Sequence, residues 1–205
     1  MPTARESLLD AALSALAGLP WPAVRMVDVA AVAGVSRQTL YNEFGSKEGL
    51  ARALVRREAD VYLRGVDRAL ALRSAPAERL VDVAEWTLGA ARSSALVRAL
   101  LTGAWSARLP APSVRTGAPV SAVPAQRRAD AGVPGPAELV AAVRDRALAV
   151  LEHEVPGADP VELGRYCETA VRLGLSFVVA PAARAGGHTG QLRAMLAGLP
   201  VRATR

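Results

Sequence analysis

The sequence predicts an all-α protein in which a three-helix N-terminal head precedes a larger helical bundle. Apolar residues recur at helical spacing along most of the chain, whereas the alternation typical of strands is nearly absent. Capping residues, glycines and prolines stand where such helices would begin and end. With 205 residues the chain can also bury a sizeable core. We expect a head over residues 1–46 and a second domain over residues 47–205.

The head opens with a capping box. Thr3 and Glu6 have the spacing at which each side chain caps the other residue's backbone amide. Apolar residues then follow at helical spacing from Leu8 to Leu16, and the helix is expected to stop near Pro20. This helix would cover the next two helices of the head.

Residues 27–50, VDVAAVAGVSRQTLYNEFGSKEGL, predict two short helices joined by a glycine turn. The first spans 27–33, Gly34 suits its left-handed cap, and Ser36 can cap a second helix over 37–44. Apolar residues expected in the seam between them are Val29, Ala33, Val35, Leu40 and Phe44. This arrangement is a helix-turn-helix, whose second helix can enter the major groove of DNA.

The outer face of that second helix is polar in an unusual way. An ordinary solvated helix face is rich in Lys and Glu, but this one carries side chains that donate to phosphates and base edges. We expect base contacts from Arg37, Gln38 and Asn42, and phosphate contacts from Thr39, Tyr41 and Lys47, with the cap Ser36 also among the DNA-binding residues. The alternative is a helical hairpin that serves only packing.

The block AGVSRQTLYNEFGSKEGL, from Ala33 to Leu50, resembles the TetR family of bacterial transcriptional regulators (TetR/AcrR type). The LY-x-x-F and SKE-x-L elements carry the resemblance, which weakens towards Leu8 and covers about the first quarter of the chain. Where the family usually begins its second helix with Thr or Ser, this chain has Arg25, whose guanidinium could still reach a phosphate. Glu43 is a second departure, because an acid there must turn away from the DNA backbone or accept from a cytosine amine.

Charge and cysteine content restrict the class of protein. The net charge is +6, but residues 1–74 hold ten basic and eight acidic side chains and so contribute only +2. Charge therefore supports a DNA partner without establishing one. The lone Cys167 excludes an intramolecular disulfide and fits a reducing cytosol. No stretch reads as a secretory signal or a membrane span, so we expect a cytoplasmic protein with no membrane partner.

In the second domain, helices are expected over residues 46–72, 77–92, 94–107, 137–154, 160–180 and 189–199. Residues 108–136 contain six prolines and predict a mobile loop. The 160–180 helix is apolar almost all round and must be buried on several sides. It is either the centre of the core or a dimerisation helix. Its surplus apolar face favours a symmetric four-helix dimer interface formed by Leu163, Val171, Leu175, Val178, Leu192, Met195 and Leu196.

An effector cavity is predicted from a few aromatic and polar residues of the middle region. The candidates are Tyr62, Trp86, Arg98, Thr102 and Trp105, with both tryptophans on predicted helices. The alternative is that the tryptophans simply fill the core. His153, Cys167 and His188 lack zinc-ligand spacing, and no nucleophile elbow or P-loop is present. We therefore expect neither an enzyme nor a bound metal or cofactor.

Taken with the resemblance, these features imply a homodimeric, ligand-responsive transcriptional regulator. The expected partners are an inverted-repeat DNA operator and a small-molecule effector that releases a repressor from it. The rival interpretation is a small-molecule-binding or scaffold protein that keeps the head but no longer binds DNA specifically. Arg25 and Glu43 are the features that favour this rival.

Overall fold

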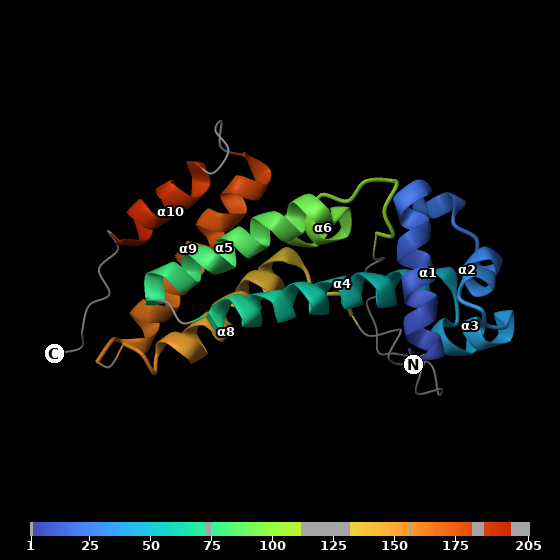
Figure 1. Ribbon diagram of the computed structural model, residues 1–205, viewed down its shortest axis with the longest axis horizontal. Coiled ribbons are helices and arrows are strands. Elements are labelled where there is room, and N and C mark those ends of the chain that lie inside the picture. Colours follow the sequence, from blue (N-terminus) through green and yellow to red (C-terminus); the bar gives the residue numbers. More distant parts are fainter. Residues whose placement is uncertain (1, 73–74, 112–131, 156, 182–186, 198–205) are drawn as a thin grey trace. The chain divides into compact units, whose positions relative to one another are not determined.

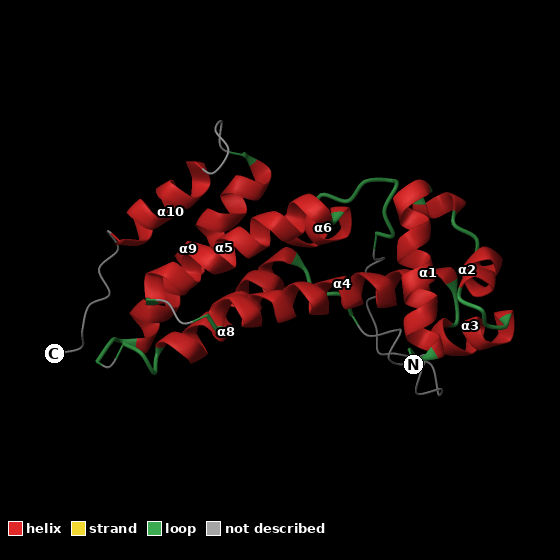
Figure 2. Cartoon of the chain, in the orientation of Figure 1, coloured by secondary structure: helices red, strands yellow, loops and turns green. Residues whose placement is uncertain are grey.

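The computed structural model describes residues 2–72, 75–111, 132–155, 157–181 and 187–197. Within these ranges the regular elements are all helices, which confirms the all-α prediction (Figure 2). Most of the predicted mobile loop falls on residues 112–131, outside the described residues. None of the described helices is both long and apolar enough to cross a bilayer.

The chain divides into two compact units. One contains residues 1–58 and 104–133, and the other contains residues 59–103 and 134–205. Helix α4 (Lys47–Leu70) begins in the first unit and ends in the second. The expected boundary after residue 46 lies at the start of α4, whereas the two units divide within this helix, after Glu58, and residues 104–133 belong to the first unit.

Helices α1 (Ala4–Gly18), α2 (Met26–Val32) and α3 (Arg37–Phe44) form the head, together with the 3-10 turn η1 (Trp21–Ala23). Helix α1 lies across both α2 and α3 (Figure 1). The predicted capping box is present: the Thr3 amide donates to Glu6 Oε2 at 2.7 Å, and the Glu6 amide donates to Thr3 Oγ1 at 3.2 Å. The head's buried core includes Leu8, Val29, Leu40, Phe44 and Leu50.

The second unit packs α9 (Pro160–Val179) against α5 (Pro76–Ser93) and α8 (Pro136–Leu151). Helices α6 (Ala95–Thr102) and α10 (Gly187–Ala197) cover further parts of α9. Gly174 permits the approach to α5, because an added Cβ would lie 3.0 Å from the Cβ of Ala84. As predicted, α9 begins with Asp159 as a cap, whose carboxylate accepts from the Val161 amide at 3.0 Å.

The helix predicted over residues 94–107 is wrong at its C-terminal end. Helix α6 stops at Thr102 because Gly103 adopts a left-handed backbone, with φ at 72°, and its amide donates to the carbonyl of Ala99. Trp105 therefore lies outside the helix, in a segment that belongs to the first unit. The sequence signal for this end is Gly103 itself, which follows the last leucines of the helix.

Candidate nucleic-acid interface and ligand cavity

The turn between α2 and α3 has the geometry expected of a helix-turn-helix. Gly34 has a φ of 69°, in the left-handed region that favours glycine. Ser36 caps α3, and its Oγ accepts from the Thr39 amide at 3.0 Å and lies 2.9 Å from Thr39 Oγ1. In the seam, Val29, Leu40 and Phe44 are buried, whereas Ala33 and Val35 are half-buried. The turn therefore holds α3 in a defined orientation on α2.

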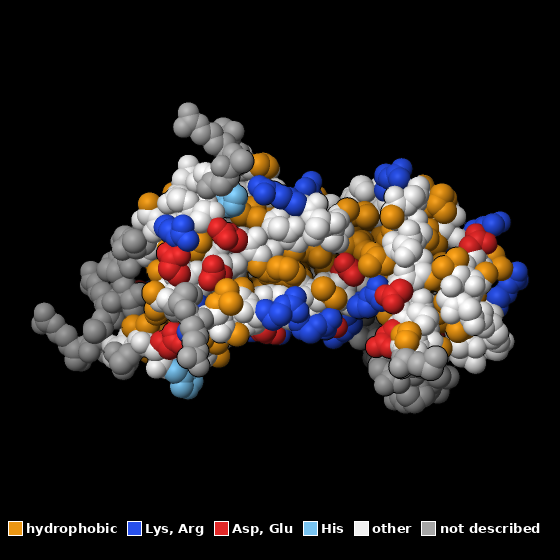
Figure 3. All heavy atoms as spheres, in the orientation of Figure 1, with side chains coloured by type: hydrophobic (Ala, Val, Ile, Leu, Met, Phe, Trp, Pro, Cys, Tyr) orange, Lys and Arg blue, Asp and Glu red, His pale blue; other side chains and the backbone are white. Residues whose placement is uncertain are grey.

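The outer face of α3 exposes Arg37, Gln38, Tyr41 and Asn42, with Thr39 half-buried behind them. Gln38 Nε2 donates to Asn42 Oδ1 at 2.9 Å, so these two predicted base contacts orient each other. In this arrangement the Asn42 amide group still has donors, and the Gln38 carbonyl is an acceptor. Figure 3 shows Lys and Arg side chains projecting from the edge of the head formed by α2 and α3.

Glu43 turns back onto α1 instead of joining this face. Its carboxylate Oε2 lies 3.3 Å from Arg5 Nη1, and the same guanidinium lies 4.7 Å from the ring centroid of Phe44. The acid is thereby neutralised within the head. The sequence had left open where Glu43 points, because its partner lies 38 residues earlier in the chain.

Arg25 occupies the N-cap position of α2 without making a side-chain cap bond. Its guanidinium instead forms a fork with Asp28, with Nε–Oδ2 at 2.7 Å and Nη2–Oδ1 at 3.0 Å. The hydrogen bonds and charge of Asp28 raise the pKa of Arg25. The pair is exposed, so Arg25 remains at the surface of the head next to the N-terminus of α2.

Lys47 has partners inside the head. Its Nζ donates to the carbonyl of Pro22 at 3.0 Å and lies 5.4 Å from the ring centroid of Trp21. The Trp21 amide in turn donates to the carbonyl of Arg108 at 2.8 Å. An ammonium group has three donors, so the bond to Pro22 leaves Lys47 chemically able to contact a phosphate as well.

The five residues predicted for the effector cavity differ in burial and in the unit to which they belong. Tyr62 is buried, its hydroxyl lies 3.0 Å from Thr87 Oγ1, and burial raises its pKa to about 12. Trp86 Nε1 donates to the Tyr62 carbonyl at 3.0 Å. These internal partners favour the alternative reading of Tyr62 and Trp86 as core residues.

The remaining candidates lie elsewhere. Arg98 is exposed and donates through Nε to the carbonyl of Ala91 at 3.2 Å, while the Thr102 hydroxyl donates to the carbonyl of Arg98 at 2.7 Å. Trp105 belongs to the first unit. The five candidates are thus not gathered around one described cavity.

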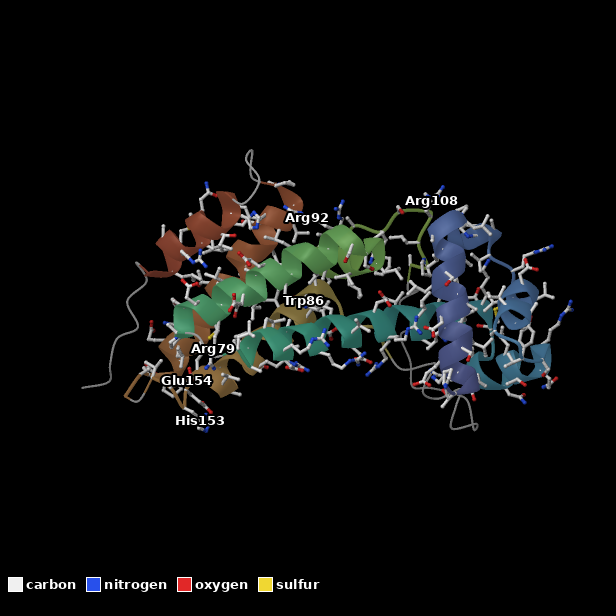
Figure 4. All side chains as sticks on the ribbon, viewed as in Figure 1. Arg79, Trp86, Arg92, Arg108, His153 and Glu154 are labelled. Atoms are coloured by element: carbon white, nitrogen blue, oxygen red, sulfur yellow. The ribbon has the colours of Figure 1, made fainter. Side chains whose placement is uncertain are left out.

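A pocket of about 400 Å³ that is open to solvent, called the cavity below, is present at another place in the second unit. Its walls come from α4, α5 and α8 and from the turn after α4, and consist of Asp67, Leu70, Ala71, Arg79, Arg146, Ala149 and Val150. Arg146 Nε lies 3.0 Å from Asp67 Oδ1, and Arg79 Nη1 lies 2.8 Å from Glu154 Oε1. Figure 4 shows Arg79 and Glu154 pointing toward each other. These residues were not predicted from the sequence, in which they appear only as isolated opposite charges on otherwise apolar helices.

Four of the seven predicted dimer residues are covered by the chain itself. Leu163, Val171, Leu192 and Leu196 are buried in the second unit and offer no surface to a second copy. The apolar stripe of α9 is wide enough to serve both the core and a partner, and these four residues belong to the part that faces the core. Leu175 and Val178 are half-buried and Met195 is 49% exposed, so these three remain candidates.

In the described part of the chain, no three side chains of the metal-ligating types converge. Cys167 is buried in α9, and burial raises its pKa to about 11, so its thiol stays protonated near neutral pH. Cys167 behaves as a small core residue.

Comparison with known families places the head. Residues 8–54 match the family described as bacterial regulatory proteins, tetR family. A curated relative, the HTH-type transcriptional regulator AlkX of Mycobacterium tuberculosis, is 47% identical over 66 residues. That match covers 32% of this chain and 31% of the relative, so it spans less than a third of that regulator's length.

Solved structures resemble the chain over nearly its whole length. The TetR family repressor AlkX from a Dietzia strain, implicated in biodegradation of n-alkanes, has a TM-score of 0.53 at 22% identity. That likeness covers 95% of this chain and 94% of the repressor. The regulator FadR of Bacillus subtilis, solved with stearoyl-CoA, has a TM-score of 0.51 at 13% identity and covers 97% of this chain and 98% of FadR. At these identities the structures show a shared fold.

Proposed function

We propose that the chain belongs to the TetR family, which its head matches over residues 8–54, and that it is a ligand-responsive, DNA-binding transcriptional regulator. The observation that carries the proposal is the outer face of α3. Exposed Arg37, Gln38, Tyr41 and Asn42 stand on a capped helix, and the one acid of that helix, Glu43, is paired with Arg5. Such a face offers donors to DNA without an opposing charge.

The side chains of the head divide into two roles. Arg37, Gln38 and Asn42 read base edges in the major groove, since their amide and guanidinium groups match purine acceptors and donors. Thr39, Tyr41 and Lys47 bind phosphates, with Ser36 as the cap and Arg25 as a further phosphate contact beside α2. These contacts set the register of α3 on the duplex.

The regulator acts as a homodimer on an inverted repeat. Two copies of α3 must lie about 34 Å apart to occupy successive major grooves on one face of DNA. The partly exposed apolar surface of Leu175, Val178 and Met195 would hold the two copies together. A two-fold interface uses the same patch on both subunits. Here that patch would consist of these three residues of α9 and α10.

A small molecule releases the protein from its operator, and regulation is repression in the cytoplasm. A ligand that prefers a state with altered spacing of the heads lowers DNA affinity by the same coupling free energy, about 1–3 kcal/mol. The Dietzia relative is a repressor and FadR was solved with an acyl thioester, which supports this mode of regulation. The rival, a protein that has lost specific DNA binding, has less support now that Glu43 has a partner in α1.

The test is to select duplexes from a random library with the purified full chain and to measure their affinity by fluorescence anisotropy. We expect an enriched inverted repeat that binds about a thousandfold or more tighter than random DNA at the same salt concentration. Enrichment of no sequence, with equal affinity for every duplex, would overturn specific DNA binding and favour the rival.

A further inference from the structure

The cavity of the second unit combines an apolar wall with two arginines. Leu70, Ala71, Ala149 and Val150 supply the apolar wall, and Arg79 and Arg146 enter from α5 and α8. Its volume of about 400 Å³ falls in the range of small-molecule sites, roughly 300–1,000 Å³. An apolar pocket with a few convergent polar groups is the usual composition of such a site.

Both arginines already hold a carboxylate. Arg146 pairs with Asp67 of α4, and Arg79, whose side chain is only 12% exposed, pairs with Glu154 after α8. Guanidinium groups bind carboxylates through charge-assisted hydrogen bonds. The protein's own acids therefore show which ligand group the arginines at this site accept.

The two ion pairs differ in how easily a ligand carboxylate could replace the protein's own acid. The Asp67 side chain is 54% exposed and that of Arg146 is 36% exposed, so water can solvate either group when the pair opens. Exposed pairs of this kind contribute little to stability, so a competing carboxylate can replace Asp67. The Arg79–Glu154 pair is more enclosed and is suited to hold the wall of the cavity in place.

We propose that this cavity binds an amphipathic carboxylate, whose acid group replaces Asp67 on Arg146 and whose apolar tail lies against Leu70, Ala71 and Val150. A neutral molecule has no charged group to replace the Asp67 carboxylate on Arg146. The apolar wall selects against small polar acids, because removing a hydrocarbon tail from water supplies the free energy that a surface ion pair lacks.

Displacing Asp67 would also remove an ionic link between α4 and α8. Asp67 and Lys47 belong to one continuous helix, so the ligand acts on the helix that leads into the head. The regulatory consequence rests on the proposed function, whereas the binding site does not.

The direct test is isothermal titration calorimetry of the full chain with octanoate, and with octanol and octylamine as probes that share its tail. Octanoate should bind. Octanol and octylamine should bind about tenfold more weakly or not at all, because they lack the carboxylate that forms a charge-assisted hydrogen bond with Arg146. Arg146→Gln should weaken octanoate by a similar factor. Asp67→Asn should tighten it about fivefold, since the internal competitor is gone. Arg172→Gln, an exposed arginine of α9 outside the cavity, is the matched control and should change nothing.

The Asp67→Asn variant separates a binding role from a structural one, because a merely structural ion pair predicts no gain in affinity. Equal binding of octanoate and octanol, or no tightening in Asp67→Asn, would overturn the site. Octanoate that binds as expected but leaves DNA affinity unchanged would overturn the regulatory consequence alone. Octanoate binding by a chain that selects no DNA sequence would instead overturn the proposed function and leave the site standing.

Discussion

The indole ring of Trp86 in α5 lies against Gly65 in α4, so closely that a methyl group added at Gly65 would overlap the ring. The same indole donates to the carbonyl of Tyr62, one turn earlier in α4, and Arg68 lies 5.6 Å from its ring centroid. Three positions of α4 thus surround one tryptophan. A glycine inside a helix costs free energy, and here the close approach of α5 accounts for it.

Replacing Gly65 with Ala should therefore destabilise the protein by about 1–3 kcal/mol, because the indole must shift out of a packed position. Gly89→Ala is the control within α5, since nothing lies within 4 Å of the added methyl group. That change should stabilise the protein by roughly 0.5–1 kcal/mol through helix propensity. Urea unfolding of both variants measures the difference, and two equal shifts would contradict the packing argument.

The pairing of Arg5 with Glu43 should matter for DNA binding. Arg5→Met removes the partner and leaves Glu43 as an uncompensated acid on the proposed DNA-binding helix. We expect affinity for all duplexes to fall by about fivefold at low salt and by less at high salt. Adding Glu43→Gln should restore it. A double variant as weak as Arg5→Met alone would show that Arg5 acts on DNA directly.

Substitutions at Lys47 and at the base-reading residues should affect operator and random DNA differently. Lys47→Gln should weaken operator and random DNA alike and reduce the salt slope by about one unit. Arg37→Ala or Gln38→Ala should cost about 1–3 kcal/mol mainly on the operator, through lost base contacts. Salt-dependent anisotropy titrations on both duplexes distinguish these patterns. Equal losses on both DNAs for every variant would refute the division of roles.

The exposed part of the α9 stripe should control self-association. Val178→Glu would bury an unpaired charge in the proposed interface and should convert dimers into folded monomers at micromolar concentration. Val161→Glu is the control on the same helix, because Val161 is 60% exposed near its opposite end. Sedimentation velocity reports the mass. A Val178→Glu dimer with unchanged mass would place the interface elsewhere.

Two buried acids should make the fold sensitive to alkali. Burial raises the pKa of Cys167 from 9.0 to about 11 and that of Tyr62 from 10.0 to about 12. The unfolded chain therefore loses these protons first, and stability falls as pH rises from about 9 towards 11. We expect a loss on the order of 1 kcal/mol from Cys167 between pH 9 and pH 10. Urea titrations of Cys167→Ala should show a smaller decrease over that range.

The helix starts of the head could be predicted because their signals are local. The structure contains both capping bonds, one between Thr3 and Glu6 and one between Ser36 and Thr39. It also contains the left-handed turn at Gly34 that ends α2. The end of α6 at Gly103 is equally local, although the prediction placed it five residues later, at residue 107. Local backbone chemistry is therefore sufficient for most of the helix boundaries.

Contacts between distant segments were beyond prediction, since many pairings satisfy the same composition. Glu43 could have faced DNA, and only folding brings Arg5 beside it. Leu163 and Val178 are both apolar residues of α9, but the fold buries the first and leaves the second partly exposed. The tryptophans suggested a cavity. The pocket found in the second unit is instead lined by charged side chains from three helices together with apolar residues.

By itself the sequence determined the helical class, the head and the chemistry of α3, because these depend on residue types at fixed spacing along one helix. The tertiary structure decided which apolar faces remain open, which acids have a basic partner, and where a pocket forms. Burial and ion pairing depend on distances across the fold. One helix does not specify them, since the same amphipathic surface can serve the core, a second subunit or a cavity wall.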